Sequence, residues 1–375
     1  MTPPPARIVA ALVAVLALAL APAADAKRSV PQGFMGMNWD GAIAGAPESV
    51  QQQQFPQMAT AGVETLHAAF QWAFAQPQEN GPIDLSRTDA LVRMAAQRRI
   101  RVLPIVILAP DWAKLNKAPL SPPRSPDLIA PYTRALIARY GPKGSFWAAN
   151  PGLPRLPIRD WQYWNEAELS YQWTLTHHED WARTYTAHLR AFHGYVRKAD
   201  PGARVVLGSL TNESWKHLRR LYAAGAGRYF EVATLNPYTA KPGGVLRIVQ
   251  YYRAVMKKHH QAHKPVWITE LGLPASRGRA KSDNTLQTTD RGMAKWLTGA
   301  YAQVVAALHR PALRVTRVYW YTWASEYQTD DVFRYTGLLR YRPGGGTSRK
   351  PAYAAFVKVA RKLTGCKRSE AGICE

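Results

Sequence analysis

Short apolar runs alternate with longer amphipathic segments along most of this chain. The short runs have the length and composition of buried β-strands. They lie at residues 33–38, 63–70, 101–108, 160–165, 204–210, 231–236, 265–269 and 315–321. The longer segments repeat apolar residues at helical spacing, as at residues 86–99, 126–140, 178–199, 245–263 and 286–309. Alternating strands and helices predict an α/β fold with a parallel sheet.

Eight strands, each followed by a helix, favour a single-domain (β/α)8 barrel. The alternative is a doubly wound open sheet, which normally has a glycine-rich first turn, and this sequence has none there. Helix-boundary residues support the assignment. Ser86 is expected to cap a helix with Asp89 in its first turn, and the pair 201–202 (Pro-Gly) to end the helix after the fourth strand.

Two glutamates stand at the ends of predicted strands: Glu166 ends the run 161–166, and Glu270 ends the run 265–270. A carboxylate at the tip of a buried strand is costly to desolvate unless it is paired or has a function. In a (β/α)8 barrel, active residues lie at the C-terminal ends of the strands. The two glutamates therefore predict paired-carboxylate chemistry, with glycoside hydrolysis as the leading candidate.

The first 26 residues have the pattern of a secretory signal peptide. Arg7 precedes an apolar run at residues 8–21, and residues 24–26 (Ala-Asp-Ala) fit a cleavage site. An uncleaved anchor is the alternative. We therefore expect a secreted or cell-surface protein, with a catalytic domain at residues 27–364.

Both cysteines, Cys366 and Cys374, fall in the C-terminal tail at residues 365–375. In an oxidising compartment they are expected to form one disulfide, and a pair of free thiols is the alternative. No histidine lies near them, and the two His-His pairs of the chain lack a third ligand at metal spacing. We therefore expect no metal and no cofactor.

The formal net charge is +24, and loss of residues 1–26 removes one cation and one anion and leaves it unchanged. Such a charge favours anionic partners such as an acidic polysaccharide, although it also promotes solubility. The lysines and arginines are scattered and no nucleic-acid-binding motif is present, so nucleic acid is not expected. We expect a monomer without stable membrane insertion, because no stretch beyond the leader is long and apolar enough to span a bilayer.

Several short motifs follow the predicted strands. They are Asn165-Glu166, Thr269-Glu270, residues 108–113 (LAPDWA), Asn236-Pro237-Tyr238, residues 321–324 (YTWA), residues 337–339 (GLL) and residues 350–353 (KPAY). With these motifs in this order, the chain resembles glycoside hydrolase clan A, the retaining β-glycosidases on (β/α)8 barrels. It resembles most closely the family 39 and cellulase-like members of that clan. The resemblance extends from about residue 33 to residue 360.

The resemblance implies a role for each matching residue. Glu166 would be the general acid/base, and Asn165 would bind the substrate 2-hydroxyl. Glu270 would be the nucleophile, held as a carboxylate by a hydrogen bond from Tyr238. The retaining mechanism needs the two carboxyl groups roughly 5–5.5 Å apart, and strands four and seven face each other across a barrel mouth.

Aromatic residues after the strands are candidate sugar platforms. The resemblance favours Trp323, with Trp320 as its alternative, and Trp112 and Trp72 are weaker candidates. Core packing is the competing interpretation for each of them.

Two positions depart from the family pattern. His67 stands where the family usually has an arginine that bonds the nucleophile, and Asn236 stands where a histidine is common. A histidine is a weaker and pH-dependent substitute for an arginine.

The sequence therefore predicts a secreted retaining glycoside hydrolase that acts on β-linked oligo- or polysaccharides. Two alternatives share the fold. One is a non-catalytic carbohydrate-binding barrel of the cell envelope, which the His67 departure suggests. The other is a transglycosylase, which would use the same carboxyl groups and transfer the sugar to an acceptor other than water.

Overall fold

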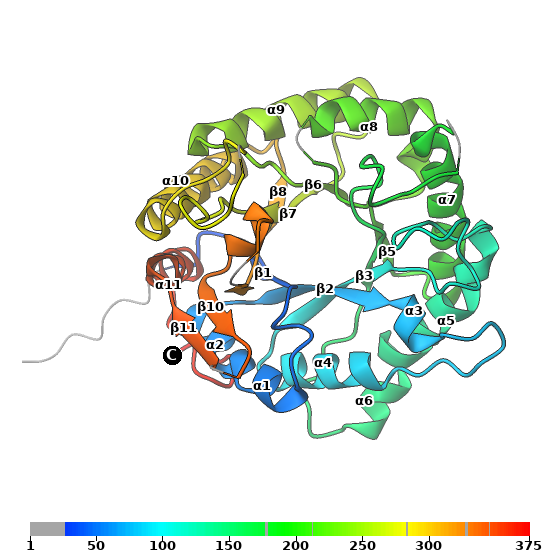
Figure 1. Ribbon diagram of the computed structural model, residues 1–375, viewed down its shortest axis with the longest axis horizontal. Coiled ribbons are helices and arrows are strands. Elements are labelled where there is room, and N and C mark those ends of the chain that lie inside the picture. Colours follow the sequence, from blue (N-terminus) through cyan, green and yellow to red (C-terminus); the bar gives the residue numbers. More distant parts are fainter. Residues whose placement is uncertain (1–26, 177–178, 212, 283, 327–328, 345) are drawn as a thin grey trace, which may run out of the picture.

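A computed structural model describes residues 27–176, 179–211, 213–282, 284–326, 329–344 and 346–375. Eight parallel strands stand around a central axis with helices outside them (Figure 1). Their order is β5-β4-β3-β2-β1-β8-β7-β6, and a bridge between Val206 and Val232 links β5 to the segment before β6. The predicted single-domain (β/α)8 barrel is confirmed.

Each predicted strand run contains one barrel strand. The strands are β1 (Met35–Trp39), β2 (Thr65–Gln71), β3 (Arg101–Ile107), β4 (Asp160–Tyr163), β5 (Arg204–Val206), β6 (Ala233–Leu235), β7 (Val266–Leu271) and β8 (Val315–Trp320). Five buried residues close the barrel interior below the mouth, namely Leu103, Val206, Val232, Trp267 and Tyr319. They come from opposite sides of the barrel, so they form a packed floor and not a pore.

The helices cover the outside of the barrel. They are α1 (Glu48–Gln52), α2 (Gln54–Ala61), α3 (Trp72–Ala75), α4 (Ser86–Gln97), α5 (Ala130–Tyr140), α6 (Ser145–Ala149), α7 (Trp181–Ala199), α8 (Ser214–Ala223), α9 (Pro242–Lys258), α10 (Asp290–Leu308) and α11 (Pro351–Thr364). The Ser86 cap was wrong: Ser86 is the first helical residue, and its backbone N–H donates to Asp84 at 2.8 Å. The end of α7 before residues 201–202 agrees with the prediction.

A small sheet follows the last barrel strand and was not predicted. It consists of β9 (Ala324–Ser325), β10 (Leu339–Arg342) and β11 (Gly346–Arg349), and it leads into α11. Its strands are short and largely polar, so they give no clear apolar run.

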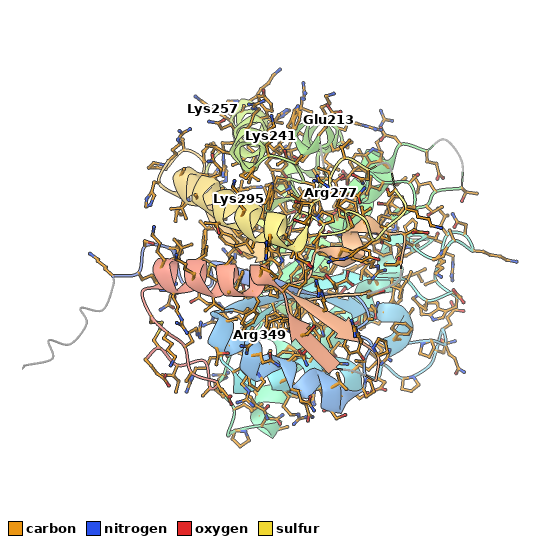
Figure 2. All side chains as sticks on the ribbon, turned by 60° about the vertical axis from the view of Figure 1, so that its left-hand side comes forward. Glu213, Lys241, Lys257, Arg277, Lys295 and Arg349 are labelled. Carbon is orange, nitrogen blue, oxygen red and sulfur yellow. A yellow bond between two sulfur atoms is a disulfide. The ribbon has the colours of Figure 1, made fainter. Side chains whose placement is uncertain are left out.

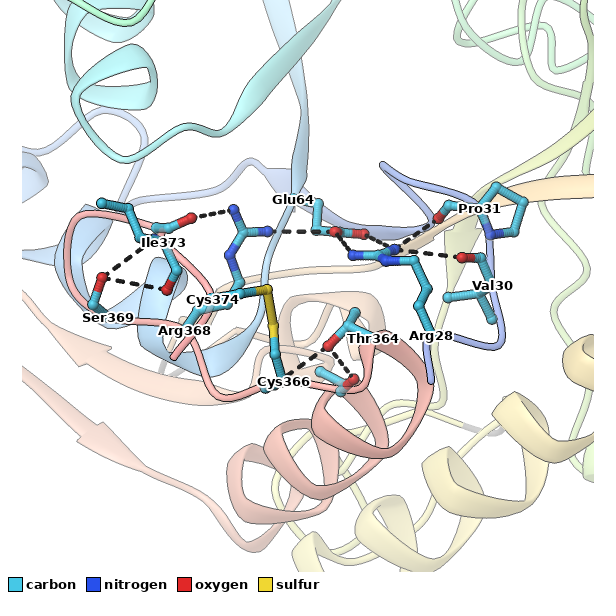
Figure 3. Close-up of a disulfide and its surroundings, with 12 residues drawn as sticks. Arg28, Val30, Pro31, Glu64, Thr364, Cys366, Arg368, Ser369, Ile373 and Cys374 are labelled. Carbon is cyan, nitrogen blue, oxygen red and sulfur yellow. Dashed lines mark hydrogen bonds and ion pairs between the residues drawn. A yellow bond between two sulfur atoms is a disulfide. The ribbon is translucent and has the colours of Figure 1, made fainter. Parts of the chain in front are cut away.

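The C-terminal tail closes on itself through the predicted Cys366–Cys374 disulfide, with an S–S distance of 2.03 Å. Figure 3 shows how the tail is held. The buried carboxylate of Glu64 forms an ion pair with Arg28 on one side and with Arg368, 3.4 Å away, on the other. Glu64 immediately precedes β2, so this ion cluster ties both ends of the described chain to the base of the barrel.

No helix within the described ranges is long and apolar enough to cross a membrane. The predicted signal peptide, residues 1–26, lies outside the described residues.

Candidate active site

Glu166 follows β4 in a left-handed backbone conformation, with φ of 50°, and Trp164 has φ of 57°. Residues other than glycine rarely adopt this region, which costs roughly 1–3 kcal/mol at each position. Two backbone hydrogen bonds hold the turn: Trp164 N–H donates to Val106 O at 3.0 Å, and Glu166 N–H donates to Ser209 O at 2.9 Å. Strain maintained in this way is common at functional sites.

The carboxyl group of Glu166 is buried and accepts a hydrogen bond from Asn236 Nδ2 at 2.7 Å. Asn236 is oriented in turn, because its Oδ1 accepts from Thr269 Oγ1 at 3.0 Å, and Thr269 accepts from Ser209. Burial raises the pKa of Glu166 to about 8, and the charge of Glu168 adds to the rise. Glu166 is therefore largely protonated at neutral pH.

Glu270 lies near the end of β7 and is also buried. Tyr238 OH donates to Glu270 Oε2 at 2.6 Å, and Asn165 Nδ2 lies 3.4 Å from Glu270 Oε1. Burial and the charge of Glu166 raise the pKa of Glu270, whereas these two donors oppose the rise. The contact that the sequence analysis expects between Tyr238 and Glu270 is present.

Because burial raises the pKa of both groups and the charge of Glu166 raises that of Glu270 further, Glu166 and Glu270 are not both ionised readily at neutral pH. Hydrogen bonds to the charged form decide which of the two keeps the negative charge. Glu270 accepts from two side chains and Glu166 from one. This difference favours a Glu270 carboxylate beside a protonated Glu166.

Glu168 is a third carboxyl group beside this pair. Its Oε1 accepts the backbone N–H of Thr211 at 2.5 Å, while its buried Oε2 has no hydrogen-bond partner within the described part of the chain. Burial raises its pKa to about 7. Glu168 is thus placed to influence the proton on Glu166.

His67 does not bond Glu270, so the expected direct contact with the nucleophile position is wrong. Strand β2 continues to Gln71, and His67 lies four residues below that end. Its ring nitrogens lie 2.7 Å from Asn38 Oδ1 and 2.9 Å from Gln162 Oε1. Burial lowers its pKa to about 4, so the ring is neutral at neutral pH.

His67 nevertheless connects the two strands that carry the glutamates. Asn38 Nδ2 donates to Thr269 O, directly before Glu270, at 2.8 Å. Gln162 Nε2 donates to Trp164 O, two residues before Glu166, at 3.0 Å. Through these two amides, the histidine positions the backbone below both carboxyl groups.

Two of the tryptophans predicted as sugar platforms, Trp323 and Trp72, lie in the core. Trp323 is fully buried; its indole N–H donates to Gln54 on α2, and its ring packs against Tyr353 on α11. Trp72 is fully buried as well and packs edge-on against the half-buried Trp112. Trp323 and Trp72 are core residues here, and only Trp112 keeps part of its surface exposed.

Other aromatic residues do lie at the mouth. Tyr171 is 64% exposed. Partial burial and the charges of Glu166 and Glu270 raise its pKa, which places it within electrostatic reach of both glutamates. Tyr321 donates to Asp40 at 2.8 Å, and Phe333 packs edge-on against Tyr238. The sequence analysis named Tyr321 only as part of the motif at residues 321–324, and it missed Tyr171 and Phe333, which lie in a loop and in a short 3-10 helix where no apolar periodicity marks them.

A cavity of about 590 Å³ opens beside the mouth. Its lining runs from the ends of β1 and β2 to α3 and α4 and includes Trp39, Asp40, Gln71, Phe74 and Arg87.

Within the described ranges, no three His, Cys, Asp or Glu side chains are grouped so that they could hold a metal ion. The mouth thus offers carboxyl, amide, hydroxyl and aromatic groups, which are the groups that bind and hydrolyse sugars.

A strand-end carboxyl pair on a (β/α)8 barrel is the arrangement found in retaining glycosidases. Comparison with solved structures gives the same class of fold. A family 39 glycoside hydrolase from the gut symbiont Bacteroides cellulosilyticus WH2 superposes with a TM-score of 0.67 at 17% identity, over 91% of this chain and 65% of that one.

A monomeric β-xylosidase from Caulobacter crescentus CB15 matches with a TM-score of 0.61 at 16% identity, over 88% of this chain and 69% of that one. A family 1 β-glucosidase from Thermotoga maritima matches with a TM-score of 0.62 at 10% identity, over 90% of this chain and 99% of that one. This chain therefore spans about two thirds of the length of the first two proteins and nearly all of the third.

No protein-family profile matches the sequence, and no curated protein matches it either. At these identities the likeness shows the fold, which this chain shares with the glycosidases.

Proposed function

We propose that this protein is a retaining glycoside hydrolase that cleaves β-linked oligo- or polysaccharides. The observation that carries the proposal is the pair of buried carboxyl groups, Glu166 and Glu270, with unequal hydrogen-bond environments. Burial raises the pKa of both groups, that of Glu166 to about 8, and the two donors to Glu270 oppose its rise and favour its ionised form. A double displacement needs these two protonation states together.

In the first step, Glu270 attacks the anomeric carbon as a carboxylate while Glu166 gives its proton to the leaving oxygen. The glycosidic bond breaks, and an ester forms between the sugar and Glu270. Tyr238 holds the attacking carboxylate from one side. Asn165, whose amide nitrogen lies 3.4 Å from Glu270 Oε1, is placed to donate to a substrate hydroxyl.

In the second step, Glu166 is a carboxylate and accepts a proton from water. The water attacks the anomeric carbon, the ester to Glu270 breaks, and Glu270 leaves as a carboxylate. Asn236 donates to Glu166 and stabilises its charged form at this stage. Two inversions return the original anomeric configuration.

The cavity beside the mouth supports an oligomeric substrate. It adds about 590 Å³ at the ends of β1 and β2, and Phe74, which is 54% exposed, and Arg87 stand on its wall. Tyr171 lies exposed near the carboxyl pair and offers a ring face for a sugar. We therefore propose that several sugar units bind, with cleavage at Glu166 and Glu270.

We further propose that the protein is exported. The pattern of residues 1–26 supports this, as does the disulfide, which forms in oxidising compartments. Mass spectrometry of the protein secreted by its own cells tests it: a mature N-terminus at Lys27 is expected, and a full-length cellular product would contradict it.

Glu166→Gln and Glu270→Gln, assayed on a panel of β-glycosides, test the enzymatic proposal. Each is expected to lose at least a thousandfold in kcat/KM, while His309→Gln, a change at the C-terminal end of α10, serves as a control with full activity. Azide should rescue Glu166→Ala and give a β-glycosyl azide. Full activity in either glutamine variant would overturn the proposal.

A further inference from the structure

A groove of about 630 Å³ runs along the outside of the barrel between α2 and α11. Arg349, Lys358 and Arg361 line it, and all three are exposed. Arg349 lies over the ring of the buried Tyr353, with its guanidinium carbon 4.5 Å from the ring centroid, so the tyrosine holds the guanidinium in the groove wall. No acidic side chain lines the groove, and none of the three cations forms an ion pair with a residue in the described ranges.

The groove borders a broad basic face. The helices α9, α10 and α11 carry eight exposed lysines and arginines, namely Arg247, Lys257, Lys258, Arg291, Lys295, Lys358, Arg361 and Lys362, and a single acidic residue, Asp290. Figure 2 shows Lys257, Lys295 and Arg349 on this side of the molecule. The high net charge is thus displayed on an outer surface that continues into the groove.

The barrel mouth has the opposite character. Four carboxyl groups gather there, those of Asp40, Glu166, Glu168 and Glu270. The nearby cation Arg334 is already paired with Glu326 at 2.9 Å and Asp331 at 3.4 Å. The carboxyl groups make the mouth less attractive to a polyanion than the cation-lined groove on the outside of the barrel.

We infer that the groove between α2 and α11 is a binding site for an anionic polysaccharide, separate from the barrel mouth. Its three exposed cations supply the positive charge that such a chain needs, and the ring of Tyr353 holds the Arg349 guanidinium in the groove wall. The site holds the protein on an acidic polymer while the mouth remains free for another chain. The inference does not rest on the proposed activity.

Binding of polygalacturonate to the mature protein, measured by calorimetry at several salt concentrations, tests this site, with neutral dextran as the reference polymer. The groove variant combines Arg349→Gln, Lys358→Gln and Arg361→Gln. The matched control removes three exposed cations from α7 and α8 by Arg190→Gln, Lys198→Gln and Arg219→Gln. Both variants have the same net charge, and thermal unfolding checks that both are folded.

The groove variant is expected to bind polygalacturonate at least tenfold more weakly, and the control less than threefold more weakly. Glu270→Gln is expected to bind as the wild type does, since it alters only the mouth. Equal losses in the two triple variants would overturn the site, because they would show diffuse attraction. So would undetectable binding, loss of binding in Glu270→Gln, or stronger groove-dependent binding of single-stranded DNA or phosphatidylserine vesicles.

Discussion

The hydroxyl of Tyr238 is the strongest donor to Glu270, and its removal gives a sharp prediction about pH dependence. Tyr238→Phe deletes one O–H···O contact of 2.6 Å and leaves the ring that packs on Phe333 in place. A hydrogen bond to a charged group contributes about 1.5–3 kcal/mol. The ionised form of Glu270 loses that stabilisation, so the pKa of Glu270 rises further.

The acidic limb of the kcat/KM profile reports ionisation of the nucleophile in the free enzyme. It should therefore move to higher pH in Tyr238→Phe. At a fixed pH on that limb, kcat/KM should fall roughly tenfold to a hundredfold, because a loss of about 1.5–3 kcal/mol corresponds to that change in rate. The alkaline limb, which the pKa of Glu166 near 8 sets, should move little.

Tyr321→Phe is the matched control, because it removes another tyrosine hydroxyl at the mouth that bonds Asp40 and not Glu270. Its acidic limb should coincide with that of the wild type. An unchanged acidic limb in Tyr238→Phe, or an equal loss at every pH, would refute the assignment of Glu270 as the ionised partner.

Three further predictions concern Glu168, which lies beside Glu166, and the ion cluster and disulfide at the base of the barrel. Glu168→Gln removes a charge that raises the pKa of Glu166, so the alkaline limb should move below pH 8; a shift to higher pH would contradict this. Glu64→Gln leaves two arginines without their shared carboxylate and should lower the free energy of unfolding by about 2–3 kcal/mol in urea titrations (Figure 3). Cys366→Ser with Cys374→Ser opens a loop of sequence separation 8 and should cost roughly 2–3 kcal/mol, whereas unaltered stability would show that the loop is held by its other contacts.

The barrel and its two carboxyl groups could be predicted because each rests on a local pattern. A strand buried on both faces gives a continuous apolar run, and a glutamate that ends such a run is conspicuous in any sequence. The Tyr238 contact came from the family resemblance, and the structure supplies its geometry.

The surroundings of the site depended on details that no local pattern encodes. His67 was expected at a strand end. Strand β2 continues to Gln71, so His67 lies inside the barrel, four residues before the end of the strand. Trp323 was expected at the mouth, but β8 ends at Trp320 and the chain then turns the indole towards α2 and α11. Tyr171 lies in an irregular loop, so only the folded chain brings it near the carboxyl groups.

Covalent trapping tests the central claim most directly. The wild type is incubated with the 2-deoxy-2-fluoro analogue of a β-glycoside that it hydrolyses, carrying a good leaving group, and the protein is digested and mapped by mass spectrometry. A glycosyl ester on the peptide at Glu270, absent in Glu270→Gln, is the predicted result. An adduct on Glu166 or Glu168, or rapid hydrolysis with an inverted product and no adduct, would contradict a double displacement through Glu270.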